Sequence, residues 1–195
     1  MSRIDLDALS ALWERRWPSP PGDSPMRLAH PDRWVRFHSL PESKRYPDDE
    51  AEYAVVLDRH HTLLSELGPS DTELYVVTRE WNGDCDLVVR MRQLQEVDPD
   101  GELWVSHVHD DDFPDDIVYE HQYVSRRRRS RQDLDPLLRL VADDIIAGVT
   151  LAPLDLRWLY HPYDGGGDVF APSSAIRDAL KTAYHDWLST HPTGM

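Results

Sequence analysis

The feature that most constrains the fold is a group of four β-rich segments in the middle of the chain, with helical segments before and after it. The four segments cover residues 73–81, 86–94, 102–110 and 117–125, and short polar links join them. They are rich in valine, tyrosine and tryptophan, which suit a half-buried pleated strand. Short links between consecutive strands favour antiparallel pairing, so the segments predict a four-stranded antiparallel meander.

Amphipathic patterns flank this group. Asp49 and Glu52 have the spacing of a capping box at the start of one helix, and Gly68 is a stop signal at its end. His60 falls on the apolar stripe of that helix and is expected to be a hydrogen-bonded core histidine. Apolar stripes predict helices over residues 5–17, 49–67, 133–148 and 173–190.

Two more strands are predicted, over residues 33–40 and 156–162. Residues 18–25 contain four prolines and read as a linker, and residues 145–154 read as a helix end followed by a linker. Strands grouped between helices predict the α+β class. We therefore expect a single α+β domain over residues 1–195, in which 1–25 form an N-terminal helix and a proline-rich linker. Its central, mostly antiparallel sheet is expected to have about five to six strands, packed by about three or four helices.

The chain is strongly acidic. Its 21 lysines and arginines face 36 aspartates and glutamates, which gives a formal net charge of −15 at pH 7. This charge repels nucleic acid and anionic membranes and attracts basic surfaces, although solubility alone would also account for it. The charge therefore predicts a basic protein as the possible partner, with no nucleic-acid or membrane partner.

Several kinds of site are disfavoured by what the sequence lacks. No apolar run reaches the ~20 residues of a membrane span, and the N-terminus has no signal-peptide core, so a cytoplasmic location is predicted. Cys85 is the single cysteine, which excludes an internal disulfide and a cysteine-rich zinc site. P-loop, Rossmann and serine-hydrolase motifs are missing, so no cofactor and no catalytic residue are predicted. The oligomeric state is left open.

Three histidines are candidates for metal ligands. His107 and His109 would share one face of a strand, and His121 would lie near His107 if their strands paired. The stretch 109–116 adds aspartates that could supply oxygen ligands. However, the spacing matches no established metal motif, so no metal site is predicted.

The arginine run in residues 125–132, SRRRRSRQ, has no interleaved aromatic residues. Such a run can bind phosphate or RNA. In this acidic chain we expect it to pair with carboxylates of the protein itself.

The densest polar stretch is HPYDGGGDV, residues 161–169. Pro162 favours an extended backbone at His161, and Asp164-Gly165 is a turn signal. The glycines permit a positive φ, so the chain can reverse and bring Asp168 back beside the strand. A ligand-binding loop and a plain hairpin both fit this pattern.

Two stretches, RWVRFHSLPESKRYPDDEAEY (33–53) and LRWLYHPYDGGGDV (156–169), resemble the paired signatures of a bacterial family. The signatures are RFHSLPxSKRYP and HPYDGGxDV, and the family is known only as a domain of unknown function. The resemblance covers most of the chain loosely and implies no activity. It implies a candidate binding site made of Arg36, His38, Ser43, Lys44, Arg45, Tyr46, His161, Tyr163, Asp164 and Asp168.

The two signatures would meet if their strands were neighbours. Lys44 and Arg45 would then face Asp164 and Asp168, because both loops open at strand ends. This cluster would be either a polar pocket or an ion-pair lock between the two loops.

Three functions are compatible with these patterns. The leading hypothesis is a non-catalytic interaction domain, immunity-like or regulatory, that binds a basic protein partner. The alternative is a hydrolase or small-ligand-binding enzyme that uses the His161–Asp168 loop, with or without a metal. A third is a subunit that buries tryptophans such as Trp81 or Trp104 in an oligomer.

Overall fold

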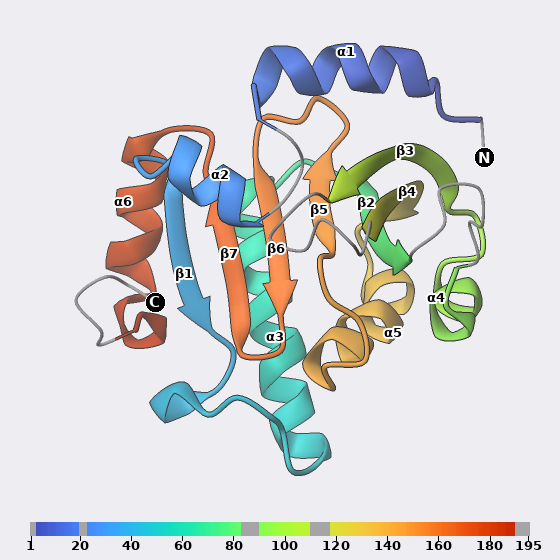
Figure 1. The fold of residues 1–195 in the computed structure, drawn as a ribbon. Helices are drawn as coiled ribbons and strands as arrows, with labels where there is room; N and C mark the ends of the chain where they lie inside the picture. The colour runs from blue at the N-terminus through green and yellow to red at the C-terminus, as the bar shows by residue number, and fades with distance from the viewer. Residues whose placement is uncertain (1–2, 20–22, 83–89, 110–117, 190–195) are drawn as a thin grey trace.

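The computed structural model describes residues 3–19, 23–82, 90–109 and 118–189. One antiparallel sheet runs through the molecule, with its strands in the spatial order β1-β7-β6-β5-β2-β4-β3 (Figure 1). The strands are β1 (Trp34–His38), β2 (Glu73–Asn82), β3 (Glu102–His109), β4 (Val118–Arg128), β5 (Thr150–Pro153), β6 (Leu159–Tyr163) and β7 (Gly166–Phe170). The helices are α1 (Leu6–Arg16), α2 (Asp23–Ala29), α3 (Glu50–Leu67), α4 (Arg92–Val97), α5 (Arg131–Ala142) and α6 (Ser174–Ala183), with short 3-10 turns η1 (Pro41–Ser43) and η2 (His185–Trp187).

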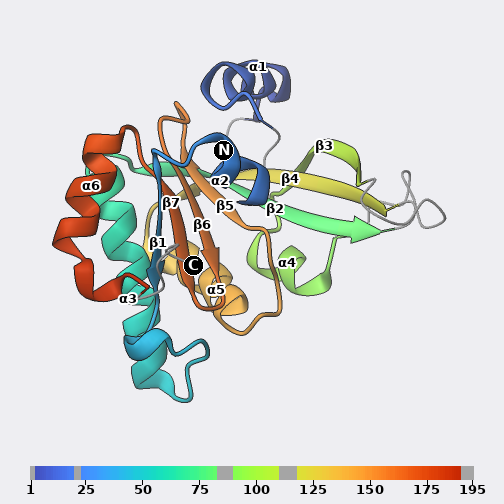
Figure 2. The same ribbon diagram turned by 60° about the vertical axis from the view of Figure 1, so that its left-hand side comes forward.

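Helices pack on both faces of the sheet (Figures 1 and 2). One face, which we call the α3 face, is covered by α3, α5 and α6, and Leu63 and Leu138 belong to the same buried cluster as Val76 of β2. The opposite face, the α1 face, packs against α1 and α2, where Trp13 and Met26 lie in a second buried cluster. Burial of each side chain of this size contributes roughly 1.5–3 kcal/mol.

Side-chain caps fix the starts of the predicted helices. The Asp5 carboxylate accepts a hydrogen bond from the backbone N–H of Ala8 at 3.0 Å, at the start of α1. At the start of α3, the Asp49 carboxylate accepts from Glu52 N–H at 2.9 Å. The Glu52 carboxylate accepts from Asp48 N–H at 2.7 Å, one residue earlier than in a standard capping box.

The predicted α+β class is confirmed, although the sheet has seven strands and the described residues form six α-helices, more than predicted. The four-stranded meander is wrong, because β4 lies between β2 and β3 and β2 pairs with β5 on its other side. The prediction of a strand over 86–94 is also wrong for residues 90–94, which are the part of this range that the structure describes. Arg92–Val97 forms α4 instead, and residues 83–89 lie outside the described part of the chain.

Two other boundaries differ from the predictions. The helix predicted over 133–148 ends at Ala142, and Asp144 has a φ of 54°, which turns the chain toward β5. All four residues of β5 are buried, so it lacks the alternation that would have distinguished it from a linker. Similarly, α2 begins inside the predicted linker, and the last helix ends at Ala183 before η2.

Candidate functional site

Strands β6 and β7 form a hairpin whose turn is Asp164-Gly165, with Tyr163 paired to Gly166. The predicted reversal of the chain is therefore present, but its glycines serve another purpose than expected. None of the three glycines has a positive φ. A Cβ on Gly166 would lie 1.9 Å from the carbonyl oxygen of Phe37 in β1. Gly166 thus allows β7 to approach β1 closely.

Arg36 and Asp168 form a charged pair across β1 and β7, where their Cα atoms are direct partners in the register. Arg36 donates two hydrogen bonds of 2.7 Å each to the two carboxylate oxygens. Asp168 is 2 % exposed, so its carboxylate depends on this partner for compensation. The Arg36 guanidinium also lies 4.6 Å from the centre of the Tyr163 ring. Burial raises the pKa of Tyr163 to about 12.

His161 lies in the sheet and not at the mouth of the turn. It is 2 % exposed, and its Nδ1 is 3.0 Å from the Oγ1 of Thr150 in β5. Its ring makes an edge contact with Phe170, with 5.3 Å between the ring centres. Because His161 is also the register partner of Asp168, a polar row crosses four strands from Arg36 through Asp168 and His161 to Thr150.

The two signature loops touch through Arg45 and Asp164. The Arg45 guanidinium donates to both Asp164 oxygens, with Nη2 at 3.1 Å from Oδ1. Asp164 is 6 % exposed, and a hydrogen bond to it raises the pKa of the Tyr46 hydroxyl. The turn is further tied to β1 by the Ser39 N–H, which donates to the Gly165 carbonyl at 2.9 Å. The predicted contact between the loops is present for Arg45 and Asp164.

The remaining predicted residues of the first loop lie elsewhere. Lys44 does not face the hairpin, because its ammonium group bonds Asp48 at 2.7 Å and Glu52 at 2.5 Å, at the start of α3. Ser43 is exposed, with a φ of 57°. His38 is partly buried at the end of β1, and burial lowers its pKa, an effect that the backbone of Gly165 partly offsets.

The strands that carry the two signatures are not neighbours, because β7 lies between β1 and β6. The loops meet nonetheless, since the turn of the hairpin reaches the end of β1. We call the contacts Arg36–Asp168 and Arg45–Asp164 the loop lock. The sequence suggested either a polar pocket or an ion-pair lock between the loops, and these ion pairs agree with the lock.

The loop lock holds together a strongly acidic end of the molecule, at the bottom of Figures 1 and 2. Arg139 of α5 bonds Glu50 of α3 at 2.6 Å, and the Tyr53 hydroxyl bonds Asp143. The hydrogen bond with Asp164 is the main cause of the raised pKa of Arg45, and the charge of Asp144 adds a smaller effect. The segments joined by these contacts, residues 42–52, 139–144 and 164, carry eight carboxylates and three cations, namely Glu42, Asp48, Asp49, Glu50, Glu52, Asp143, Asp144 and Asp164 against Lys44, Arg45 and Arg139. We call this surface the acidic end.

Sequence reasoning missed a polar group on the α1 face. The Arg79 side chain of β2 is 6 % exposed and its Nε lies 3.4 Å from the Glu120 carboxylate of β4. Within the described residues, Nε and Nη2 of Arg79 have no hydrogen-bond acceptor. Gln122, the register partner of Arg79, donates to Glu120 at 2.5 Å. Strand alternation could have placed Arg79 on one face, but its partners depend on the order of the strands.

The two histidine candidates whose side chains are described, His107 and His121, do not share a face of the sheet. His107 is the register partner of Glu120, whereas His121 pairs with Ser106, so the two imidazoles project from opposite faces of the sheet. His121 is fully buried and bonds Ser106 Oγ at 2.7 Å. In the parts of the chain that the structure describes, no group of three or more potential ligands could hold a metal ion. The side chain of His109 and residues 110–117 lie outside them.

The arginine run bonds within the protein, as predicted. Arg127 donates to the buried Asp98 carboxylate at 2.7 Å, and Arg131 bonds Asp58 at 2.6 Å. Arg129 instead donates to the carbonyl oxygens of Leu64, at 2.9 Å, and of Gly68, which caps the end of α3.

The fold and the site define an α+β domain with one antiparallel sheet, helices on both faces and polar loops locked together at one end. The chain belongs to the family described as Domain of unknown function (DUF3885), whose profile matches residues 23–192. The predicted membership of a family of this kind is confirmed. Comparisons with curated proteins and with solved structures give no match. Among the described residues, no helix has both the length and the apolar character needed to cross a membrane.

Proposed function

We propose that this protein is a non-catalytic interaction domain that binds a basic protein partner through its acidic end. The observation that carries the proposal is the excess of carboxylates over cations on this surface, in a chain of net charge −15. Exposed carboxylates attract a basic surface at long range and speed its association.

The surface also has features of a contact site. Asp48 and Glu50 have side chains that are 83 % and 78 % exposed, so a partner can reach them. Tyr46, 44 % exposed, lies beside them and offers a large aromatic contact of the kind that is enriched at interfaces. The loop lock holds the backbone of both loops in place, which lowers the entropic cost of binding.

The same contacts weigh against the alternative, an enzyme that uses the His161–Asp168 loop. A general base must reach the substrate, whereas His161 is buried and bonded to Thr150. Asp168 is bonded to Arg36 of β1, and Asp164 is bonded to Arg45 of the first loop. These residues are better suited to holding the loops than to proton transfer.

The proposal predicts salt-sensitive capture of a basic partner. The full chain is used as bait in a lysate of its own organism at low and high salt, and a recovered protein is purified and its Kd measured. The triple variant Glu42→Gln, Asp48→Asn, Asp144→Asn should weaken this Kd by at least about fivefold, because it removes exposed charges from the interface.

A matched triple variant controls for net charge. Asp32→Asn, Glu96→Gln and Asp100→Asn remove the same charge from exposed positions away from the acidic end. This variant should change the Kd by less than about twofold. Equal weakening by both variants, or an affinity that does not respond to salt, would show that the acidic end is not the binding surface.

A further inference from the structure

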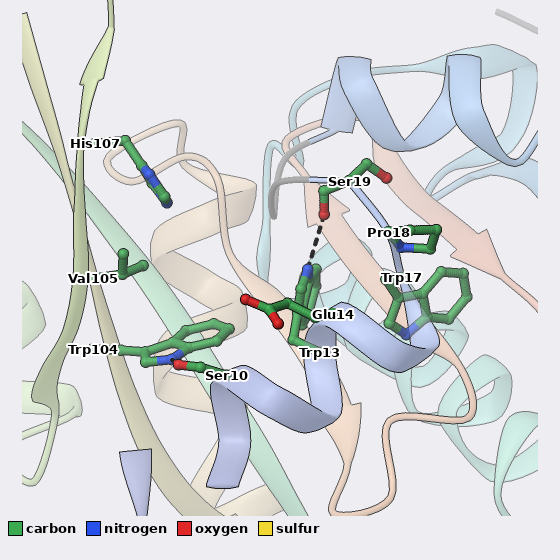
Figure 3. Close-up of a pocket in the computed structure, with 9 residues that line it drawn as sticks. All are labelled: Ser10, Trp13, Glu14, Trp17, Pro18, Ser19, Trp104, Val105 and His107. Atoms are coloured by element: carbon green, nitrogen blue, oxygen red, sulfur yellow. Dashed lines mark hydrogen bonds between the residues drawn. The ribbon is translucent and has the colours of Figure 1, made fainter. Parts of the chain in front are cut away.

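A pocket with a volume of about 460 Å³ lies on the α1 face between α1 and β3 (Figure 3). Its volume is in the range of about 300–1,000 Å³ that is typical of ligand sites. α1, which lines the pocket, lies at the opposite end of the molecule from the start of α3 in the acidic end (Figures 1 and 2), so the pocket is independent of the proposed function. α1, which forms one wall, lies outside the residues matched by the family profile.

The walls of the pocket are aromatic. Trp13 of α1 and Trp104 of β3 make an edge contact, with 5.7 Å between ring centres and 68° between ring planes. Trp17 also lines the pocket. Trp104, which the sequence suggested for an oligomer contact, is thus partly covered by α1 of its own chain.

The indole N–H groups of the pocket already have acceptors. Trp104 Nε1 donates to Ser10 Oγ at 2.9 Å, and Trp13 Nε1 donates to the Ser19 carbonyl at 2.9 Å. Trp17 Nε1 donates to the Leu156 carbonyl at 2.8 Å. None of the three can therefore give a ligand a further hydrogen bond. Trp13 and Trp17 are 5 % and 0 % exposed, so the partly exposed Trp104 ring is the one on which a ligand can stack.

Glu14 is the polar group that the pocket presents to a ligand, because its side chain is exposed. Glu14 extends from α1 toward β3, where Trp104 and His107 stand (Figure 3), and it forms no ion pair with any described residue. The Nε2 atom of His107 is buried without a hydrogen-bond partner in the described part of the chain. No lysine or arginine is among the described residues that line the pocket. The pocket thus combines an accessible indole ring with a negatively charged carboxylate acceptor.

We propose that this pocket binds a guanidinium group on an apolar stem, as in an arginine side chain of a peptide. A guanidinium is flat and can stack on the Trp104 ring, and its N–H groups can donate to the exposed Glu14 carboxylate. The protein itself contains such a stack, since the Arg33 guanidinium lies 3.9 Å from the centre of the Trp17 ring. A ligand with its own free carboxylate is disfavoured, because no described cation faces it.

The test is a titration of the full-length protein with N-acetyl-arginine amide, followed by NMR of the indole N–H groups. The resonances of Trp13 and Trp104 should shift and saturate, whereas that of Trp158, which is fully buried on the α3 face, should not move. N-acetyl-citrulline amide has nearly the same shape without the charge, and it should bind at least about tenfold more weakly.

Free L-arginine distinguishes a peptide side chain from a free amino acid. It should bind more weakly than N-acetyl-arginine amide, and tighter binding would overturn the assignment to a peptide side chain. Absence of saturation with N-acetyl-arginine amide, or equal binding of the citrulline compound, would overturn the guanidinium site altogether.

A pair of charge variants locates the contact. Glu14→Gln should weaken binding of N-acetyl-arginine amide by about fivefold, because it removes the charged acceptor from the pocket. Glu96→Gln, which removes the same charge from an exposed position of α4, should leave binding unchanged. If the two variants behave alike, Glu14 does not contact the ligand and the proposal is wrong.

Discussion

Asp168 shows how a buried charge is accommodated in this sheet. Its carboxylate faces Arg36 directly across two paired strands and is bonded through both oxygens. The sequence indicated that both residues matter, through a family resemblance, but paired Asp168 with the wrong loop residues. The register of β1 against β7 makes Arg36 its partner, and Lys44 turns to α3 instead.

Asp168→Asn tests the loop lock at this residue. The variant leaves Arg36 partly buried without a carboxylate, so we expect a loss of about 3 kcal/mol in the free energy of unfolding. Urea unfolding should show a lower midpoint with an unchanged slope. Arg45→Gln removes an ion pair whose arginine is 62 % exposed, and it should shift the midpoint much less. Equal shifts would mean that burial of the Arg36–Asp168 pair is unimportant for stability.

His60 is the core histidine that the helical stripe predicted. It is 1 % exposed, and its Nδ1 lies 2.5 Å from the Tyr160 hydroxyl, which links α3 to β6. Burial, with a smaller effect from His61, lowers the pKa of His60 to about 3. The imidazole is therefore neutral in the native state at neutral pH.

This shift predicts a pH dependence of stability. Between the native pKa of about 3 and the ordinary value of 6.5, the unfolded chain binds the proton and the native chain does not, so stability falls as pH falls through this window. From about pH 7 to about pH 5, His60 should remove about 2 kcal/mol from the free energy of unfolding. His60→Gln keeps an acceptor for Tyr160 but does not titrate, and its unfolding curves should lack this loss. If the stability of the two proteins changed with pH in the same way, His60 would not be the group responsible for the loss.

Among the helices and strands, the sequence pattern predicted the start of an element where a side chain of the same segment caps it. α1 and α3 begin where Asp5 and Asp49 cap them. β5 and α4 were missed because their boundaries depend on distant partners. β5 is buried on both sides between β2 and β6, and α4 is followed by Asp98, which bonds Arg90 and Arg127.

The close approach of β1 and β7 gives a prediction at the scale of elements. Gly166→Ala would place a methyl group against the Phe37 backbone, which cannot rotate away as a side chain can, so the two strands must separate. We expect a decrease in Tm of about 10 °C. Gly165→Ala is the matched control, since its nearest contact is the Tyr163 ring at 3.0 Å, and it should change Tm by less than about 3 °C. A Gly166→Ala protein with an unchanged Tm would show that the strands tolerate the extra atom.

At the scale of the whole molecule, strand order decides where charge accumulates. The acidic end joins the loop after β1, the start of α3 and the end of α5, which are far apart in the sequence. The net charge of −15 was evident from composition, but its concentration here was not. Capture of a basic partner should weaken as salt is added, because salt screens the electrostatic field of the whole acidic surface.

The sequence by itself determined the α+β class, the helix caps, the β6–β7 hairpin and the strongly acidic character, because spacing and composition act locally. Only the tertiary structure decided that β7 lies between β1 and β6, that Arg36 pairs with Asp168, and that α1 and β3 enclose a tryptophan-lined pocket. The physical reason is that strand order and helix docking depend on contacts between distant segments. Local periodicity shows which face of an element is apolar but not which partner will cover it.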